Sequence, residues 1–163
     1  MSNPTNDSRD GERSTHERGR VDMVDGPDTA ERHRKLVREY YESFCTFDPA
    51  QYEHLVEADA YYEVGHNQYH GHEGFRTVAK MARFLYPNGL QMEIKDMIVE
   101  GNKVATRITT RAVTNKGEDY ENYYAVHFLI SDDGRIAELY EFTDTAYAHQ
   151  KFSYDGFEAM LAS

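Results

Sequence analysis

The chain of 163 residues contains one cysteine, no tryptophan and no cluster of lysine or arginine. A lone Cys45 excludes an internal disulfide and favours a reducing compartment, so we expect a cytoplasmic protein. No apolar run approaches the length of a membrane span or of a signal-peptide core, which excludes a membrane partner. The net charge of −11 and the missing basic stripe also exclude nucleic acid as a partner.

The chain divides into a polar beginning and a longer part with a core. Residues 1–27 hold very few large apolar side chains and many Ser, Asp, Glu, Arg and Gly residues. Such a composition does not offset the entropy of ordering, so we predict a disordered tail over 1–27. Residues 28–163 are long enough to bury one core, and no Gly- or Pro-rich linker divides them, so we predict a single domain.

The pattern of apolar residues predicts helices first and strands later. Helical spacing is seen over residues 28–46, a short helix follows Asp48-Pro49, and a third helix precedes the stop at 87–89. A short strand is expected at 61–64, followed by a loop over 65–71. Four strands are expected at 90–100, 103–114, 118–130 and 135–143, with short C-terminal segments at 146–152 and 157–161. This order predicts an α+β domain in which a strongly bent antiparallel sheet wraps around three helices.

The last two predicted strands meet at Asp133-Gly134, a residue pair typical of a tight hairpin. Strict alternation places Tyr123 and His127 on one face of the first strand, and we assign Glu141 of the second strand to that same inner face. The other face is also apolar, which is unusual for an antiparallel sheet with a wet side. We therefore predict a homodimer through that outer face, which would carry Tyr124, Val126, Phe128, Tyr140 and Phe142.

The run Tyr120-Glu-Asn-Tyr-Tyr, the Asp-Gly-Arg-Ile turn and the closing Tyr140-Glu-Phe-Thr-Asp-Thr resemble the SnoaL-like polyketide cyclases. The resemblance covers about residues 29–152, and these cyclases belong to the nuclear transport factor 2-like, or ketosteroid-isomerase-like, superfamily. It implies a conical barrel with a deep apolar cavity. The activities of the superfamily include aldol cyclisation, isomerisation, dehydration and epoxide hydrolysis, and some members only bind or assemble.

Matching single positions narrows what the resemblance implies. In the members of phenazine biosynthesis a Tyr-Glu-Asn run precedes the last hairpin and a glutamate does acid–base work; Glu141 matches that glutamate. Against limonene-epoxide-hydrolase-like members, Glu141 matches an active aspartate. Their Arg and Asp on a middle strand match Ile108 and Thr110, so that constellation is incomplete. The base of ketosteroid isomerases falls at about Val64, which cannot carry a proton.

Three residues are the candidate catalysts. A carboxyl group in an apolar cavity has a raised pKa and can both take and give a proton, which points to Glu141. His127 could orient Glu141 or carry a second proton, and the phenol of Tyr62 could hold an enolate oxygen. The alternatives stay open: Glu141 paired with Arg107 or Arg111 at the surface, and His127 or Tyr62 as core residues with satisfied hydrogen bonds.

The expected substrate-binding residues are apolar or tyrosine-like side chains around these catalysts. They are Tyr41, Phe44, His66, Thr110, Tyr123 and Leu139. The rings could equally be core. The histidines His66, His70 and His72 invite a metal hypothesis, but they lie in a loop before a helix and we expect no metal. Asp144 is expected to cap the C-terminal helix.

Two classes of function follow. The first is an enzyme that uses no cofactor and enolises a small apolar carbonyl compound, such as a polyketide or other secondary-metabolite intermediate, leading to cyclisation, isomerisation or dehydration. The second is a non-catalytic module of the same fold that binds an apolar ligand or a partner. Epoxide hydrolysis is a third possibility, weakened by Ile108 and Thr110.

Overall fold

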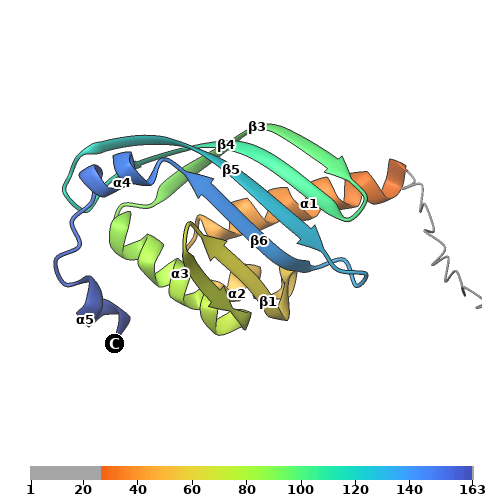
Figure 1. Cartoon of the computed structure of the whole chain (residues 1–163), viewed down its shortest axis with the longest axis horizontal. Coiled ribbons are helices and arrows are strands. Elements are labelled where there is room, and N and C mark those ends of the chain that lie inside the picture. Colours follow the sequence, from red (N-terminus) through yellow and green to blue (C-terminus); the bar gives the residue numbers. More distant parts are fainter. Residues whose placement is uncertain (1–26, 163) are drawn as a thin grey trace, which may run out of the picture.

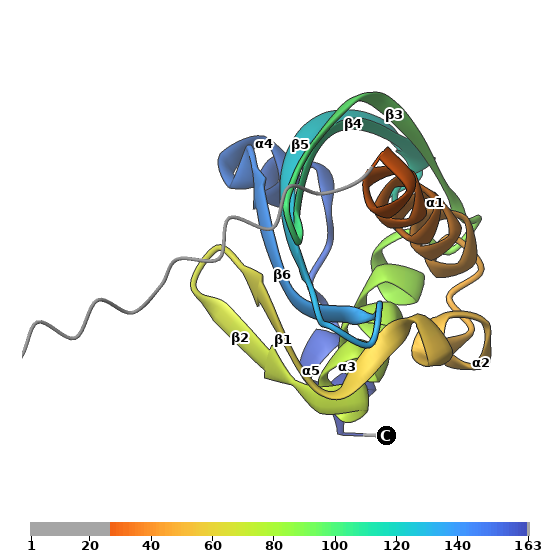
Figure 2. The same ribbon diagram turned by 90° about the vertical axis from the view of Figure 1, so that its right-hand side faces the viewer.

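A computed structural model describes residues 27–162 of the chain. Six strands form one bent, unclosed sheet in the order β2-β1-β6-β5-β4-β3. Figures 1 and 2 show the long strands arching over helix α1, with helix α3 enclosed on the same side. The predicted α+β class is confirmed, with the bent sheet wrapped around helices. The predicted tail, apart from its last residue, lies outside the described residues.

The helices are α1 (Pro27–Phe44), α2 (Pro49–Tyr52), α3 (Gly71–Leu85), α4 (Thr145–Lys151) and α5 (Phe157–Leu161), with a 3-10 turn at Glu53–Leu55. The strands are β1 (Val56–Val64), β2 (Asn67–His70), β3 (Leu90–Glu100), β4 (Lys103–Val113), β5 (Asp119–Ile130) and β6 (Ile136–Thr143). Within residues 27–162, none of the helices combines the length and the apolar character needed to cross a bilayer.

Local chemistry explains where several elements begin. The Asp48 side chain accepts a hydrogen bond from the Ala50 amide at 3.1 Å and starts α2, with Pro49 at its first position. Asp144 accepts from the Tyr147 amide at 2.9 Å and starts α4, so its predicted role as a cap is confirmed. Gly134 takes φ +77° in the turn between β5 and β6, a conformation that glycine adopts without strain.

The beginning of the sheet differs from the prediction. Residues 67–70, expected as loop, form β2, which pairs with β1 across a two-residue turn at Gly65-His66. Gly65 has φ +59°, which suits the first position of a tight hairpin turn. The sheet is also not wholly antiparallel, because β1 runs parallel to β6. That parallel pairing places Tyr62 beside Leu139 and Val64 beside Glu141.

The faces of β5 are the reverse of those predicted. Tyr124, Val126 and Phe128 are buried against the helices, whereas Tyr123 and His127 point outward. The cause is a register shift between Leu129 and Ile130, where β6 contributes one extra residue. A regular hairpin would have paired Glu141 with the outward-facing Ala125, but the shift pairs it with the inward-facing Val126. The predicted dimer face is therefore wrong for β5.

Candidate active site

Glu141 and Tyr62 meet inside the curved sheet. Glu141 lies on β6 and Tyr62 on the neighbouring β1, and their side chains both face the helices. The Tyr62 hydroxyl donates a hydrogen bond to Oε2 of Glu141 at 2.7 Å. Tyr62 is buried, and its ring packs against that of Phe75 on α3. The carboxylate is therefore held in one orientation by a donor that is itself fixed by the core.

Burial shifts the proton affinity of both partners. Desolvation raises the pKa of Glu141 to about 6, and the hydrogen bond from Tyr62 opposes part of that rise. Desolvation, followed by the charge of Glu141, raises the pKa of Tyr62 well above its usual value. The phenol thus stays protonated. At neutral pH the carboxyl group is mostly ionised yet close enough to its pKa to carry a proton in both directions.

Several buried phenols lie within electrostatic range of the Glu141 carboxylate. Its charge contributes to the raised pKa of tyrosines from several elements, namely Tyr40, Tyr41, Tyr69, Tyr86, Tyr120 and Tyr124. Although its carboxyl group is desolvated, Glu141 is only half-buried and keeps some solvent-accessible surface. Glu141 is therefore desolvated without being fully covered by protein atoms.

A second group of polar side chains lies on the inner face of β5 and at the end of α3. Nδ2 of Asn122 lies 2.9 Å from the Tyr120 hydroxyl, which lies 2.9 Å from the Tyr124 hydroxyl. The Tyr86 hydroxyl is 3.4 Å from that of Tyr124. All four residues are buried. The sequence analysis missed this series of hydrogen-bonded side chains because it placed Tyr124 on the outer face of the sheet.

Two neighbouring threonines of β4 are buried without a hydrogen bond. Oγ1 of Thr109 and Oγ1 of Thr110 have no partner among the residues that the structure describes. Their side chains point to opposite faces, because Thr109 pairs with the outward Tyr123 and Thr110 with the inward Asn122. Thr110 is therefore an unsatisfied hydroxyl on the same inner face as Glu141.

The predicted binding residues divide between the two faces. Tyr41, Phe44, Thr110 and Leu139 are buried on the inner side, and Tyr41 bonds the Thr106 hydroxyl at 2.7 Å. Tyr123 is 61 % exposed on the outer face, so its prediction as a cavity wall is wrong. His66 is exposed in the turn between β1 and β2.

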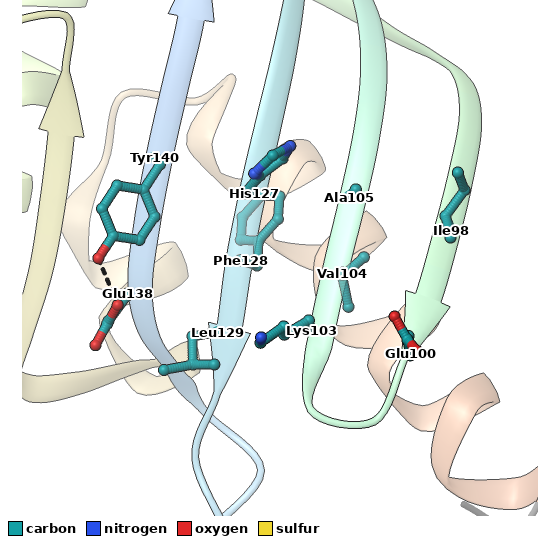
Figure 3. Close-up of a pocket in the computed structure, with 10 residues that line it drawn as sticks. All are labelled: Ile98, Glu100, Lys103, Val104, Ala105, His127, Phe128, Leu129, Glu138 and Tyr140. Carbon is teal, nitrogen blue, oxygen red and sulfur yellow. Dashed lines mark hydrogen bonds between the residues drawn. The ribbon is translucent and has the colours of Figure 1, made fainter.

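His127 also lies outside, contrary to the prediction that it shares a face with Glu141. It is exposed, and it pairs with Tyr140 across the hairpin. It lines a groove of about 390 Å³ on the outer face of the sheet, with helix α1 behind the strands (Figure 3). The outward side chains of this groove include Ile98, Lys103 and Tyr140. His127 is thus separated from Glu141 by the sheet itself.

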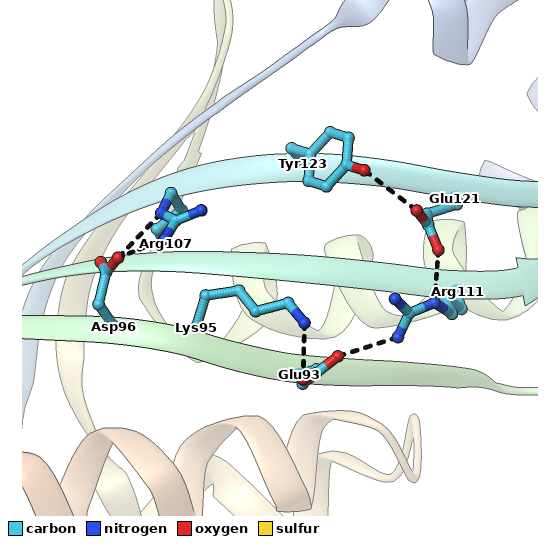
Figure 4. Close-up of polar contacts among 7 residues, drawn as sticks. All are labelled: Glu93, Lys95, Asp96, Arg107, Arg111, Glu121 and Tyr123. Atoms are coloured by element: carbon cyan, nitrogen blue, oxygen red, sulfur yellow. Dashed lines mark hydrogen bonds and ion pairs between the residues drawn. The ribbon is translucent and has the colours of Figure 1, made fainter.

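Ion pairs cover the outer face of β3, β4 and β5 (Figure 4). Arg107 binds Asp96 at 2.7 Å, and Arg111 binds Glu93 at 3.0 Å and Glu121 at 2.5 Å. Both arginines are therefore engaged outside. The alternative of a surface pair between Glu141 and one of these arginines is wrong.

The three histidines around β2 have separate surroundings. The His70 ring packs near that of Tyr61, with centroids 5.3 Å apart, and Nε2 of His72 lies 3.2 Å from the Val56 carbonyl oxygen. Within residues 27–162, no group of three or more His, Cys, Asp or Glu side chains is gathered so as to hold a metal ion.

Comparison with known proteins agrees with this architecture. The family model of the SnoaL-like domain matches residues 37–139. A protein described as a SnoaL-like polyketide cyclase from Jannaschia sp. CCS1 superposes with a TM-score of 0.69 at 14 % identity, over 78 % of this chain and 95 % of that one. PrhC from Penicillium brasilianum gives 0.65 at 19 % identity, over 75 % and 86 % of the two chains.

TerC, co-crystallised with polyporic acid, gives a TM-score of 0.64 at 17 % identity, over 74 % of this chain and 97 % of its own. At these identities the structural matches show a shared fold alone. The search among curated proteins found no match.

Proposed function

The chain belongs to the SnoaL-like domain family, and on that premise we propose that it is an enzyme that enolises a small apolar carbonyl compound without a cofactor. The observation that carries this proposal is the buried pair of Glu141 and Tyr62, joined at 2.7 Å. A polyketide or another secondary-metabolite intermediate is the proposed class of substrate. The proposal covers cyclisation, isomerisation and dehydration, since enolisation is a step common to all three.

In the proposed mechanism the Glu141 carboxylate removes a proton from the carbon beside the carbonyl group. Once protonated, Oε2 is a poorer acceptor, so the Tyr62 hydroxyl is released to donate to the oxygen of the enolate. Glu141 then returns the proton at another position or to a leaving group. A pKa of about 6 supports both steps near neutral pH.

An enclosed space beside Glu141 would hold the substrate away from water. The half-buried state of this desolvated residue supports such a space, as do the buried rings of Tyr41 and Phe44 on α1. Apolar walls would strengthen the electrostatic interactions within the site and keep the reactive enolate from bulk solvent.

The test uses 2-tetralone, a small apolar ketone whose α protons exchange with solvent deuterium when it is enolised. We expect the protein to accelerate this exchange, followed by NMR in D2O. Glu141→Gln keeps the shape of the side chain and removes its proton chemistry, so the accelerated rate should fall by about a hundredfold or more. Glu121→Gln, on the outer face, is the matched control and should change the rate less than twofold.

Exchange that is equally fast with the wild-type protein and with Glu141→Gln would reject Glu141 as the base. Binding of 2-tetralone without accelerated exchange would instead favour the non-catalytic module. Epoxide hydrolysis is disfavoured because buried Ile108 and Thr110 occupy the positions where a charged pair is needed.

We also propose a homodimer through the outer face of the sheet, with its residues corrected by the structure. Tyr123 and Phe142 are 61 % and 52 % exposed on that face, and the His127 ring packs edge-on against Phe142. Exposed aromatic side chains of this size are typical of surfaces that bind another protein. The flanking ion pairs would form a polar rim.

A further inference from the structure

The groove on the outer face of the sheet carries charges of opposite sign on β4 and on β6 (Figure 3). Lys103 of β4 is exposed, and Glu138 of β6 is half-buried. Leu129 of β5 lies between them, because it pairs in register with Lys103 on one side and with Glu138 on the other. The three side chains therefore form one row across three adjacent strands.

Neither of these two charges is neutralised within one subunit. Among residues 27–162, the Lys103 side chain has no ion pair and no hydrogen bond, although Glu100 pairs with it in register. The Glu138 carboxylate accepts a hydrogen bond from the Tyr140 hydroxyl at 2.6 Å, and no described cation binds it. Both charges are thus available to a partner.

Two-fold symmetry limits how a second copy can lie on this face. In a symmetric homodimer the same surface of both subunits makes the contact. Sheets that pack face to face in the aligned manner keep their strands within about 30° of each other. An axis across the strands would lay β4 on its own copy and bring Lys103, Arg107 and Arg111 against the same three cations. Like charges that meet across an interface cost free energy, which favours an axis along a strand.

The charges on the strands then favour β5 as the strand that follows the axis. An axis along β4 would place Arg107 against its own copy, and an axis along β6 would do the same to Glu138. An axis along β5 avoids both contacts, because it lays β4 of each subunit on β6 of the other. Leu129 would then meet its own copy on the axis, which is an apolar contact.

The register of the strands converts this arrangement into specific contacts. Rotation about an axis along β5 keeps each row at its own level, so residues of β4 would meet the residues of β6 that share their row. Lys103 would meet Glu138 of the partner subunit. Ala105 would meet Tyr140 of the partner subunit, because both pair with His127. A small side chain would thus lie opposite a large one. The bond from Tyr140 also restrains the Glu138 carboxylate before association, which lowers the entropy cost of an ion pair.

We propose that the homodimer has its two-fold axis along β5 and is held in register by two equivalent ion pairs, each between Lys103 of one subunit and Glu138 of the other. This inference rests on the proposed homodimer and adds the orientation of its subunits and the charges that select it. Charged pairs of this kind fix the register of an interface more than they add affinity, which the exposed apolar side chains of the face supply.

The test reverses each charge separately and then mixes the two variants. In Lys103→Glu and in Glu138→Lys, both symmetric contacts join like charges, so the dimer dissociation constant of each variant should rise at least about tenfold. A mixed dimer joins opposite charges at both contacts, because one subunit is acidic at both positions and the other is basic. Its dissociation constant should lie within about threefold of the wild-type value. Sedimentation velocity measures these constants, with a fluorophore on the N-terminus of one variant to identify the mixed dimer.

Two substitutions on α3 provide matched controls. Lys80→Glu and Glu73→Lys make the same changes of charge, but on the helix that lies on the inner side of the sheet (Figure 2). They separate the local contact from the effect of the net charge of −11. Each control should change the dissociation constant by less than about twofold, and mixing the two should give no gain.

Neutral variants keep the proposal testable if a reversed variant fails to fold. Lys103→Gln and Glu138→Gln each remove a charge without introducing repulsion. Each should raise the dissociation constant about threefold, as expected for the loss of partly exposed ion pairs. Salt should weaken the wild-type dimer towards the affinity of these variants, because exposed charges are screened.

The outcomes separate this pairing from the homodimer itself. A wild-type protein that sediments as a monomer at micromolar concentration would overturn both. A wild-type dimer whose dissociation constant is unchanged by either reversal would overturn the pairing and leave the homodimer intact. Reversals that weaken the dimer without recovery in the mixture would show that Lys103 and Glu138 do not pair with each other, which also overturns the proposal. Recovery in the mixture is the expected result, and a pair within one subunit could not produce it.

Discussion

Glu141 and Glu121 are glutamates on adjacent strands of one sheet, yet the protein treats them in opposite ways. Glu121 faces outward, where Arg111 binds its carboxylate at 2.5 Å and lowers its pKa. Glu141 faces inward, where desolvation raises its pKa to about 6 and its only hydrogen-bond donor among the described residues is the neutral Tyr62. The face of the sheet, rather than the residue type, decides whether the pKa of a carboxyl group is lowered by an ion pair or raised by desolvation.

The largest expected effect concerns the pH dependence of 2-tetralone exchange. If Glu141 must be ionised, the rate should rise roughly a hundredfold between pH 4 and pH 7 and level off above pH 7, because its pKa is about 6. Rates measured by NMR across this range should give the same profile in Glu121→Gln. A profile without a step near pH 6 would contradict the role of Glu141.

The pH dependence of the free energy of unfolding should also reveal the raised pKa of Glu141. The pKa of Glu141 is raised in the folded state, so the folded protein binds the proton more tightly than the unfolded chain. Its contribution is therefore fully present below about pH 4.5 and is lost as the pH rises through 6, a change of roughly 2 kcal/mol. The difference in unfolding free energy between the wild-type protein and Glu141→Gln, measured in urea at pH 4 and at pH 7, should change by this amount, because the carboxylates with lowered pKa, such as Glu121, are common to both proteins.

The outer face can be tested by its own aromatic side chain. Phe142→Asp places a charge in the centre of the proposed dimer interface, so the dimer dissociation constant should rise at least tenfold. Sedimentation at micromolar concentration measures this change. Phe142 is already 52 % exposed, so the stability of the monomer should change little. A wild-type protein that sediments as a monomer would contradict the dimer.

The smallest expected effect compares the two unsatisfied threonines. Thr109→Val and Thr110→Val each remove a buried hydroxyl without a described partner, and each should stabilise the protein by about 1 kcal/mol. Thermal unfolding at one pH measures both variants. A clear loss of stability would show that the hydroxyl is satisfied after all.

The sequence predicted most of this fold because its signals are local. The bounds of β3 to β6 follow alternation and turn residues, and the inner-face position predicted for Glu141 agrees with its pairing opposite the buried Val126. The hydrogen bond from Tyr62 could not be foreseen, since it depends on the parallel pairing of β1 with β6, which are far apart in the chain.

The misassigned face of β5 has a different physical origin. Both faces of this strand are rich in apolar side chains, so alternation gives two sets without saying which is buried. Their relation to Glu141 then depends on one extra residue near Ile136, which no turn motif reveals. The same error hid the hydroxyl chain around Tyr124, because a side chain assigned to the surface has no reason to be paired with buried phenols.

The amide of Asn122 has one further consequence. Its Nδ2 donates a hydrogen bond to the Asp144 carbonyl oxygen, and the Asp144 side chain caps the start of α4. Asn122 therefore links the start of α4 to the buried Tyr120 hydroxyl, and the stacking of Tyr147 on Tyr120 adds a second contact between this helix and the same phenol. A displacement of α4 would thus remove two contacts that hold the buried Tyr120 side chain in place.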